Sequence, residues 1–166
     1  MSGPAAPLIR PARPEDGAAI HAMVRELAEF ERLAHQHVAT VADLHAGLFG
    51  PHPSAQALVA ESGGEVIAFA LCFPTFSTFL GKPGLWLEDL YVRPAFRRQG
   101  VGRRLLLEVA AAARARGCGR LEWAVLDWNA RAIDLYRSLG AVPLAEWTTM
   151  RLTGEALAAV GMRCAD

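Results

Sequence analysis

The stretch Arg97-Arg98-Gln99-Gly100-Val101-Gly102 decides the fold of this chain. It follows the apolar run Leu85–Val92 and opens the segment Val101–Arg116, whose apolar residues recur at helical spacing. A strand, a short basic loop with two glycines and a helix, in this order, build a nest of backbone N–H groups that suits a pyrophosphate. Taken alone, such a stretch is more often a glycine turn with surface arginines, so the rest of the chain has to support the phosphate-binding interpretation.

Two better-known phosphate loops fit the sequence less well. A P-loop needs Lys-Ser or Lys-Thr after its last glycine, whereas Gly102 is followed by Arg103-Arg104. A Rossmann fingerprint needs a third glycine, where this chain has Leu105, and a turn directly after its strand. Glu122 lies near the spacing of a ribose-binding acid, so a dinucleotide site stays an alternative.

Composition limits the partners that the chain can have. The 166 residues include 17 basic and 17 acidic side chains, so there is no broad field to hold nucleic acid or an anionic membrane, and we expect a small-molecule partner. No apolar run approaches the roughly 20 residues that span a bilayer. Cys72, Cys118 and Cys164 are odd in number and far apart, which favours reduced thiols and the cytoplasm. We expect a flexible lead at residues 1–7, without the features of a signal peptide, and a single domain at residues 8–166.

Hydrophobic periodicity and turn residues divide the chain into strands and helices. The expected strands are Leu8–Arg10, Ala57–Glu61, Val66–Phe73, Leu85–Val92, Leu121–Leu126 and Trp147–Leu152. The first expected helix starts at Pro14, and the next two span His35–Phe49 and Val101–Arg116. A shorter helix is capped by Asn129 and ends at Leu139-Gly140, and the tail is expected to add a helical turn or two. The stretch Pro74–Gly84 is expected to be a loop. This order indicates an α/β fold with a mixed sheet and helices on both faces.

Glu88 and Asp89 are adjacent acids in an otherwise apolar strand. Because side chains alternate along a strand, we expect the two carboxylates on opposite faces, and therefore not as a paired acid and base. A buried acid is costly unless it has a partner or a chemical role. In the alternative interpretation the strand is an edge and one acid is simply solvated, which suits Asp89 better than Glu88.

Three other residue types were candidates for chemistry. Tyr136 follows Asn129 by seven residues, two helical turns, so both face the same side, although an ordinary core contact is the alternative. Cys118 follows a helix end, where the dipole disfavours a thiolate, so a nucleophilic cysteine is not favoured. His35 and His37 alternate instead of stacking one turn apart, so no metal site is predicted.

Several stretches together resemble the diamine acetyltransferases of the Gcn5-related N-acetyltransferase (GNAT) superfamily. The pattern Arg97-x-x-Gly100-x-Gly102 resembles the acyl-CoA loop of the superfamily, and the other blocks resemble the branch that contains thialysine acetyltransferase and spermidine/spermine acetyltransferase. The likeness covers roughly Leu8 to Leu157, and its blocks are Leu87–Val92, Arg97–Gly102, Ala124–Asn129 and Arg131–Tyr136.

The resemblance implies the GNAT fold with a mostly antiparallel sheet, a homodimer, and direct acetyl transfer from acetyl-CoA to a primary amine. In it, Tyr136 protonates the departing CoA thiolate and Glu88 serves the amine through water. Phe30, Glu31 and Glu88 match positions on the substrate side. The residues implied to contact the cofactor are Leu90, Tyr91 and Val92 at an opening of the strand, Arg97, Arg98, Gln99, Gly100, Val101, Gly102 and Arg103 at the pyrophosphate, and Asn129, Ala132 and Tyr136 beyond it.

Elementary acid–base chemistry supports these roles. A lysine-like amine with a pKa of about 10.4 is neutral in only about one molecule in 2,500 at pH 7, a cost of roughly 4.6 kcal/mol before attack. A carboxylate of ordinary pKa is a weak base, so either a raised pKa or a relay to bulk water is required. A tyrosine of pKa near 10 stays protonated and can serve the thiolate.

One departure from the branch pattern bears on the substrate. Ser77 and Thr78 stand where polyamine-acetylating members have an acid and a proline, so the attraction for a distal ammonium is reduced. We therefore expect a short, lysine-like amine such as thialysine. A polyamine, a protein or antibiotic amine, and a non-catalytic acyl-CoA sensor stay alternatives.

Overall fold

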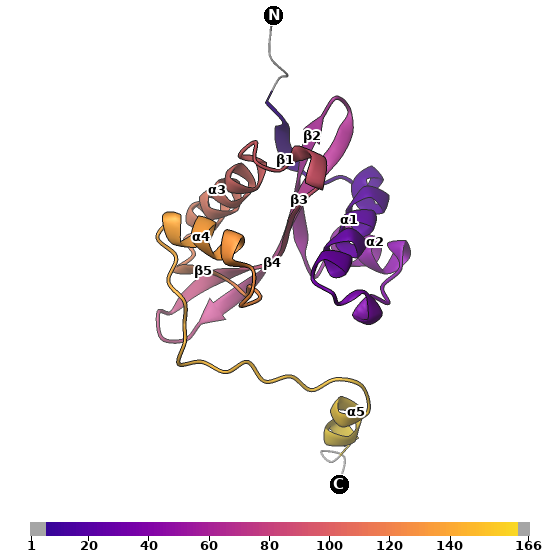
Figure 1. Cartoon of the computed structure of the whole chain (residues 1–166). Helices are drawn as coiled ribbons and strands as arrows, with labels where there is room; N and C mark the ends of the chain where they lie inside the picture. Colours follow the sequence, from indigo (N-terminus) through magenta and orange to yellow (C-terminus); the bar gives the residue numbers. More distant parts are fainter. Residues whose placement is uncertain (1–5, 163–166) are drawn as a thin grey trace, which may run out of the picture. The chain divides into compact units, whose positions relative to one another are not determined.

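The computed structural model describes residues 6–162, which form two compact units, residues 6–129 and residues 130–162 (Figure 1). Most of the lead expected at residues 1–7, and Cys164, lie outside the described residues. The expectation of a single domain over residues 8–166 stays a prediction.

The first unit contains a five-stranded sheet in the order β1-β2-β3-β4-β5. Successive strands from β1 to β4 are antiparallel, and β5 runs parallel to β4. The mixed, mostly antiparallel sheet is therefore confirmed. The strands are β1 Leu8–Pro11, β2 Gln56–Ser62, β3 Glu65–Ser77, β4 Lys82–Val92 and β5 Arg120–Trp123.

Helices cover both faces of this sheet. Helices α1, Gly17–Phe30, and α2, Val41–Phe49, lie on one face, and α3, Val101–Ala115, lies on the other (Figure 1). The spacing that predicted α1 and α3 reflects burial, because each helix turns one apolar stripe to the sheet. From α1 the stripe is Ile20, Met23 and Leu27, which pack with Val59, Phe69 and Leu71; from α3 it is Val101, Leu105, Leu106, Val109 and Ala113.

The remaining elements are short. Three 3₁₀ helices, η1 at Pro14–Asp16, η2 at Ala34–Gln36 and η3 at Pro94–Phe96, lead into longer elements or turns of the first unit. The second unit contains α4, Ala130–Ser138, and α5, Gly154–Met162, which confirms the expected helix after Asn129 and the helical turns in the tail.

The continuous helix expected at His35–Phe49 is wrong. Helix α2 begins only after Thr40, which is in an extended conformation and whose hydroxyl accepts a hydrogen bond from the Asp43 N–H at 3.2 Å. The Asp43 carboxylate accepts in return from the Thr40 N–H at 2.8 Å. This reciprocal cap fixes the start of the helix at Val41, six residues later than periodicity predicts.

The loop expected at Pro74–Gly84 is also wrong in most of its length. Strand β3 continues to Ser77 and β4 starts at Lys82, and these two residues pair directly. Only residues 78–81 form the turn, in which Gly81 has a φ of 61°. The Ser77 side chain is buried, and its Oγ accepts a hydrogen bond from the Leu80 N–H at 3.2 Å. Alternating aromatic and hydroxyl residues therefore extend the hairpin instead of interrupting it.

Two expected strands differ from the structure. Strand β5 ends at Trp123 and not at Leu126, and the segment Trp147–Leu152 forms no strand. The side chains of Trp147 and Met150 are 75% and 86% exposed. A strand needs a neighbouring strand to satisfy its backbone, and a sequence pattern alone cannot supply it.

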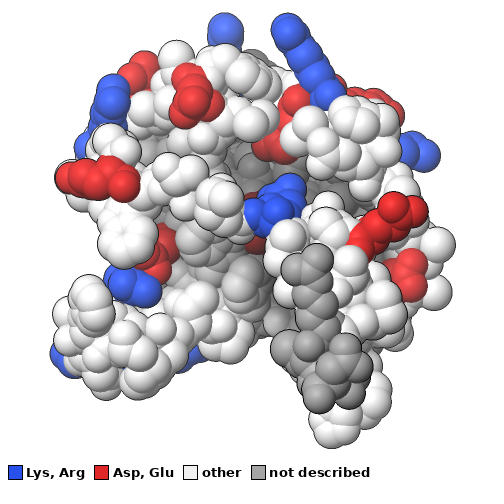
Figure 2. All heavy atoms as spheres, turned by 90° about the horizontal axis from the view of Figure 1, so that it is seen from below, with Lys and Arg blue, Asp and Glu red and all other residues white. Residues whose placement is uncertain are grey.

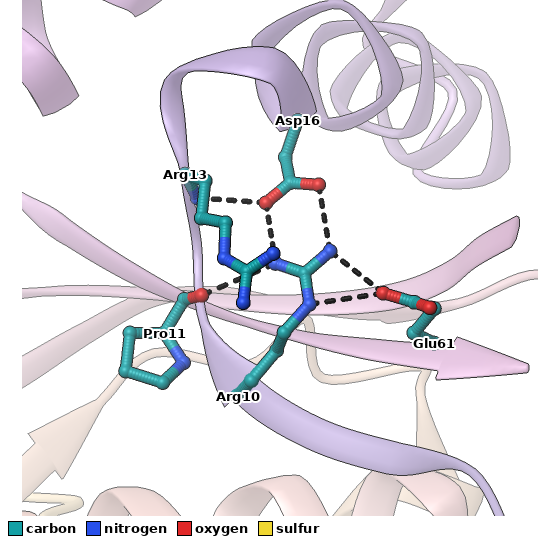
Figure 3. Close-up of polar contacts among 5 residues, drawn as sticks. All are labelled: Arg10, Pro11, Arg13, Asp16 and Glu61. Carbon is teal, nitrogen blue, oxygen red and sulfur yellow. Dashed lines mark hydrogen bonds and ion pairs between the residues drawn. The ribbon is translucent and has the colours of Figure 1, made fainter. Parts of the chain in front are cut away.

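An ion-pair network joins β1, η1 and β2 (Figure 3). The Arg10 guanidinium donates to both carboxylate oxygens of Asp16, at 2.7 and 3.0 Å, and through Nε and Nη2 to Glu61, at 2.9 and 2.8 Å. Asp16 is only 5% exposed and also accepts from the Arg13 N–H at 2.7 Å. The hydrogen bonds from Arg10 are the largest cause that holds the pKa of Asp16 below its ordinary value, against the effect of burial. The network therefore positions the start of α1 on the sheet.

We expect Arg10→Met to lower the free energy of unfolding by about 3 kcal/mol at pH 7, because it leaves a buried carboxylate without its cation. Urea unfolding measures this, and Arg104→Met, at an exposed position of α3, is the control, with an effect within about 0.5 kcal/mol. Since the pKa of Asp16 is lowered, its contribution is present above pH 3.8 and is lost as the pH falls below that value. The free energies of unfolding of Arg10→Met and of the Arg104→Met control should therefore converge in acid. Equal free energies of unfolding at pH 7 would contradict the role of Arg10.

Candidate active site

The start of α3 has the geometry of an anion nest. Gly100, the residue before the helix, has a φ of 77°, a left-handed conformation that L side chains rarely adopt, and Arg98 has a φ of 65°. The first backbone bond of the helix runs from the Arg104 N–H to the Gly100 carbonyl at 3.0 Å. The N–H groups of Val101, Gly102 and Arg103 precede it and have no partner within the helix. They are therefore free to face an anion at the positive end of the dipole.

The space in front of Gly100 suits a bulky anion. A Cβ atom built on Gly100 would meet no atom within 4 Å, whereas one on Gly102 would lie 3.4 Å from Cγ2 of Val92. The nest is thus open on its outer side and adjoins the end of β4 on its inner side. A diphosphate next to a group that lies along β4 fits both features.

Arg97 connects the loop to β4 and α1. Its Nε donates to the Val92 carbonyl at 2.8 Å, and its guanidinium carbon lies 5.1 Å from the Phe30 ring centroid and 5.3 Å from that of Tyr91. The Phe30 ring lies 5.6 Å from the ring of Trp128. The structure therefore brings together residues expected on the cofactor side and on the substrate side of the site.

Strand β4 loses a neighbour beside the nest. It pairs with β3 up to Val92, but with β5 only from Gly84 to Leu87. In the described part of the chain, residues 88–92 thus have a strand on one side only. The opening expected at Leu90–Val92 is present and already begins at Glu88. Backbone groups on the open side can bond to an extended ligand, as in strand addition.

A β-bulge lies where this opening begins. Leu87 pairs with Cys72, and Asp89 pairs with the next residue, Leu71, so Glu88 is an extra residue without a partner in β3. Neighbouring residues of β3 point to opposite faces of the sheet. Leu87 and Asp89 therefore also point to opposite faces, although they are two residues apart.

The bulge places both acids on one face, so the expectation that they lie on opposite faces is wrong. Trp86 pairs with Phe73, which shares a face with Leu71, the partner of Asp89. The Trp86 indole Nε1 donates to Glu88 at 2.8 Å, which holds Glu88 on the same face. The extra residue shifts the alternation of β4 by one position, and no sequence pattern records that shift.

The two carboxyls differ in environment. Glu88 is exposed and Asp89 is half-buried, so the solvated acid is Glu88 and not, as the sequence suggested, Asp89. Burial first, and then the charges of Glu88 and Glu31, raise the pKa of Asp89 to about 6. Burial also raises the pKa of Glu31. Three acids, Glu31, Glu88 and Asp89, therefore lie near the end of α1, and the pKa of Asp89 is shifted the most.

The remaining expected site residues belong to other elements of the chain. Asn129 ends the first unit, and its N–H donates to the Leu126 carbonyl at 2.8 Å. Ala132 and Tyr136 belong to α4 in the second unit, one turn apart on the same side of that helix, and both are half-buried. Sequence reasoning did not include Asp89 or Trp128 in the site; a Trp directly before Asn129 was the available signal for the second.

The competing interpretations gain little support. Glu122, the candidate ribose ligand, forms an ion pair with Arg120 at 2.7 Å on the same strand. Cys118 follows the C-terminal end of α3, with its N–H bonded to the Ala113 carbonyl. Among residues 6–162 there is no group of three or more metal-ligating side chains.

The surface shows no large region of a single charge on the face in Figure 2, where acidic and basic side chains are dispersed among uncharged ones. Within the described residues, no helix is both long enough and apolar enough to cross a bilayer. The local basic loop before α3 therefore suits a small anion better than a polymer.

Comparison with known proteins supports an acyl-CoA site. The model of the acetyltransferase (GNAT) family matches residues 20–141. The chain is 41% identical over 160 residues to thialysine N-epsilon-acetyltransferase of Mus musculus, with 90% of this chain and 94% of the relative covered. It is 32% identical to an L-ornithine N5-acetyltransferase of Arabidopsis thaliana, with 92% and 86% covered.

Solved structures agree on the fold. An integron cassette protein from the mobile metagenome of V. cholerae superposes with a TM-score of 0.79 at 23% identity, covering 95% of this chain and 98% of its own. The chain therefore belongs to the GNAT family of N-acetyltransferases, enzymes that take their acetyl group from acetyl-CoA.

Proposed function

We propose that this enzyme acetylates a primary amine of a small, lysine-like molecule, and that thialysine is preferred over long polyamines. The observation that carries the proposal is the opening of β4 beside the anion nest, with carboxylates on the adjoining sheet face. Relatives named as thialysine and ornithine acetyltransferases support a short amino-acid-like acceptor. Ser77, in place of an acid, is buried and bonded to its own turn, so it offers no charge to a distal ammonium.

In this proposal the loop and the open strand hold acetyl-CoA. The N–H groups of Val101, Gly102 and Arg103 bind the diphosphate, with Gly100 giving it access and the side chains of Arg97, Arg98 and Gln99 around it. Backbone groups of Leu90, Tyr91 and Val92 bond to the acyl end, and Asn129 and Ala132 contact the pantetheine. Acetyl-CoA supplies the activated acetyl group; the protein fixes its position against the amine.

The chemistry divides between two protein groups. Glu88, exposed and held by the Trp86 indole, attracts the ammonium and gives its proton an exit through water, while Phe30 and Glu31 line the acceptor side. Backbone N–H groups of the open strand stabilise the charge on the acetyl oxygen as the amine attacks. Tyr136 then protonates the CoA thiolate, because a tyrosine is still protonated near neutral pH.

We also propose that the enzyme acts as a homodimer in the cytoplasm. Support for association comes from large apolar side chains that the second unit exposes, including Trp147, Met150 and Met162. Support for the compartment comes from the free thiols of Cys72 and Cys118.

Gly100→Val is expected to weaken acetyl-CoA binding by roughly tenfold or more, about 1.4 kcal/mol, because a branched side chain strains a φ of 77° and fills the space before the nest. Gly64→Val is the matched control, since Gly64 has a φ of 82°, is equally open and lies in the β2–β3 turn. Calorimetric titration with acetyl-CoA should show a loss for the first variant only. Unchanged affinity would remove the loop from the cofactor site.

Tyr136→Phe should lower kcat by roughly 10²–10⁴ and leave the Kd for acetyl-CoA unchanged, since only the proton donor is removed. Arg137→Gln, its exposed neighbour on α4, serves as the control. Thiol release under saturating acetyl-CoA measures kcat. Full turnover in the Phe variant would reduce Tyr136 to a packing residue.

For the acceptor, kcat/KM should be highest with thialysine, lower with lysine and lowest with spermidine, because the Ser77 region lacks a second anionic contact. Initial rates of thiol release with each amine measure the order. Clear preference for spermidine would contradict the proposed acceptor class while leaving the acetyltransferase assignment intact.

A further inference from the structure

Deprotonation of the amine is the step for which the site described so far is weakest. The substrate arrives as an ammonium ion of pKa about 10.4, and an exposed carboxylate of ordinary pKa is a poor acceptor for its proton. Glu88 is exposed to solvent, which suits it to exchange a proton with water. The structure holds a second acid, Asp89, on the same face, and the bulge is what brings it there.

The position of Asp89 suits direct contact with the amine. It lies two residues after Leu87, the last residue of β4 that pairs with β5, and is therefore part of the open stretch. Tyr91, two residues further on the same face, is buried in the core with α1. Asp89 thus lies in the open part of β4, on the face that packs against α1, and it senses the charge of Glu31, which follows that helix.

Burial and the charges around Asp89 all raise its pKa. Burial, Glu88 and Glu31, in that order, all favour its protonated form. The other charged groups on this face concern Tyr91: Arg97 lies over its ring, and Glu26 acts on its hydroxyl and pairs with Arg93 at 3.4 Å. A positive ligand between Asp89 and Glu31 would offset the repulsion that these acids exert on each other.

We propose that Asp89 is a further catalytic residue, whose carboxylate takes a proton directly from the substrate ammonium and passes it to water through Glu88. One N–H bond breaks and one O–H bond forms on Asp89, and the freed nitrogen lone pair attacks the acetyl carbonyl carbon. The proton then moves to the exposed Glu88 and to solvent, and Asp89 is ready for the next turnover. This inference rests on the proposed amine acetylation.

The gain over an ordinary aspartate is substantial. A carboxyl with a pKa of about 6 in place of 3.8 is a roughly 10²-fold stronger base. It is still ionised at neutral pH, so it can accept the proton. The partly buried Asp89 thereby acts as the base, and the exposed Glu88 exchanges the proton with water.

The test compares Asp89→Asn, Glu88→Gln and a control, Glu108→Gln, at an exposed position of α3. Wild-type kcat/KM with thialysine should fall below about pH 6, following the ionisation of Asp89. Asp89→Asn should lose this acidic limb and roughly 10²–10³ of kcat, with the Kd for acetyl-CoA unchanged. Glu88→Gln should shift the limb to lower pH, because one charge that raises the pKa of Asp89 is gone. Wild-type kcat and an intact limb in Asp89→Asn would overturn the inference.

Two measurements on the free protein separate this inference from the proposed function. A carbon-13 titration of the Asp89 carboxyl should give a midpoint near 6, and an ordinary midpoint overturns the inference whatever the activity. Because the folded-state pKa is raised, ionisation of Asp89 costs stability as the pH rises from 3.8 through 6. The Tm of Asp89→Asn should therefore be higher than that of the wild type at pH 8, and the two Tm values should be alike at pH 4. If wild type binds acetyl-CoA but acetylates no amine of the panel, the proposed function itself fails.

Discussion

The structure depends on how the backbone of β4 is satisfied along its length. Strand β3 pairs with it throughout, but β5 leaves it after Leu87, and the bulge at Glu88 lies at that point. Backbone N–H and C=O groups need hydrogen-bond partners. An interior strand that loses one neighbouring strand therefore has groups on that side to which a ligand can bond. Helix α3 begins beside the end of the same strand, with its first N–H groups also unused by the helix. One geometric constraint thus generates both halves of the proposed acyl-CoA site.

The acidic groups of the molecule follow two different physical solutions. At the start of α1, the buried Asp16 is paired with Arg10 and holds the fold together. At the open part of β4, Asp89 is half-buried among other acids, which raises its pKa instead of lowering it. Charge that is paired stabilises, and charge that is left among like charges is available for a cationic substrate. The contrast identifies the second group, and not the first, as chemically poised.

The division of labour in the site follows from exposure. In the proposed site, the cofactor side is built from backbone groups and from Gly100, whose left-handed conformation other residues rarely adopt. The proposed acceptor side is built from side chains of β4 and of the end of α1. Solved structures at 23% and 17% identity share this fold, and a fold by itself does not determine which acceptor a site takes.

The sequence alone determined the family and most elements, because these rest on local signals such as the glycine spacing at Gly100 and Gly102 and the apolar stripe of α3. Tertiary structure decided the extent of β3 and β4, the start of α2 and the absence of a strand at Trp147–Leu152, since pairing and capping involve contacts that periodicity does not encode. It also decided the faces of Glu88 and Asp89. A single extra residue in β4 reverses the alternation on which the sequence argument relied, and only the partner strand shows where that residue lies.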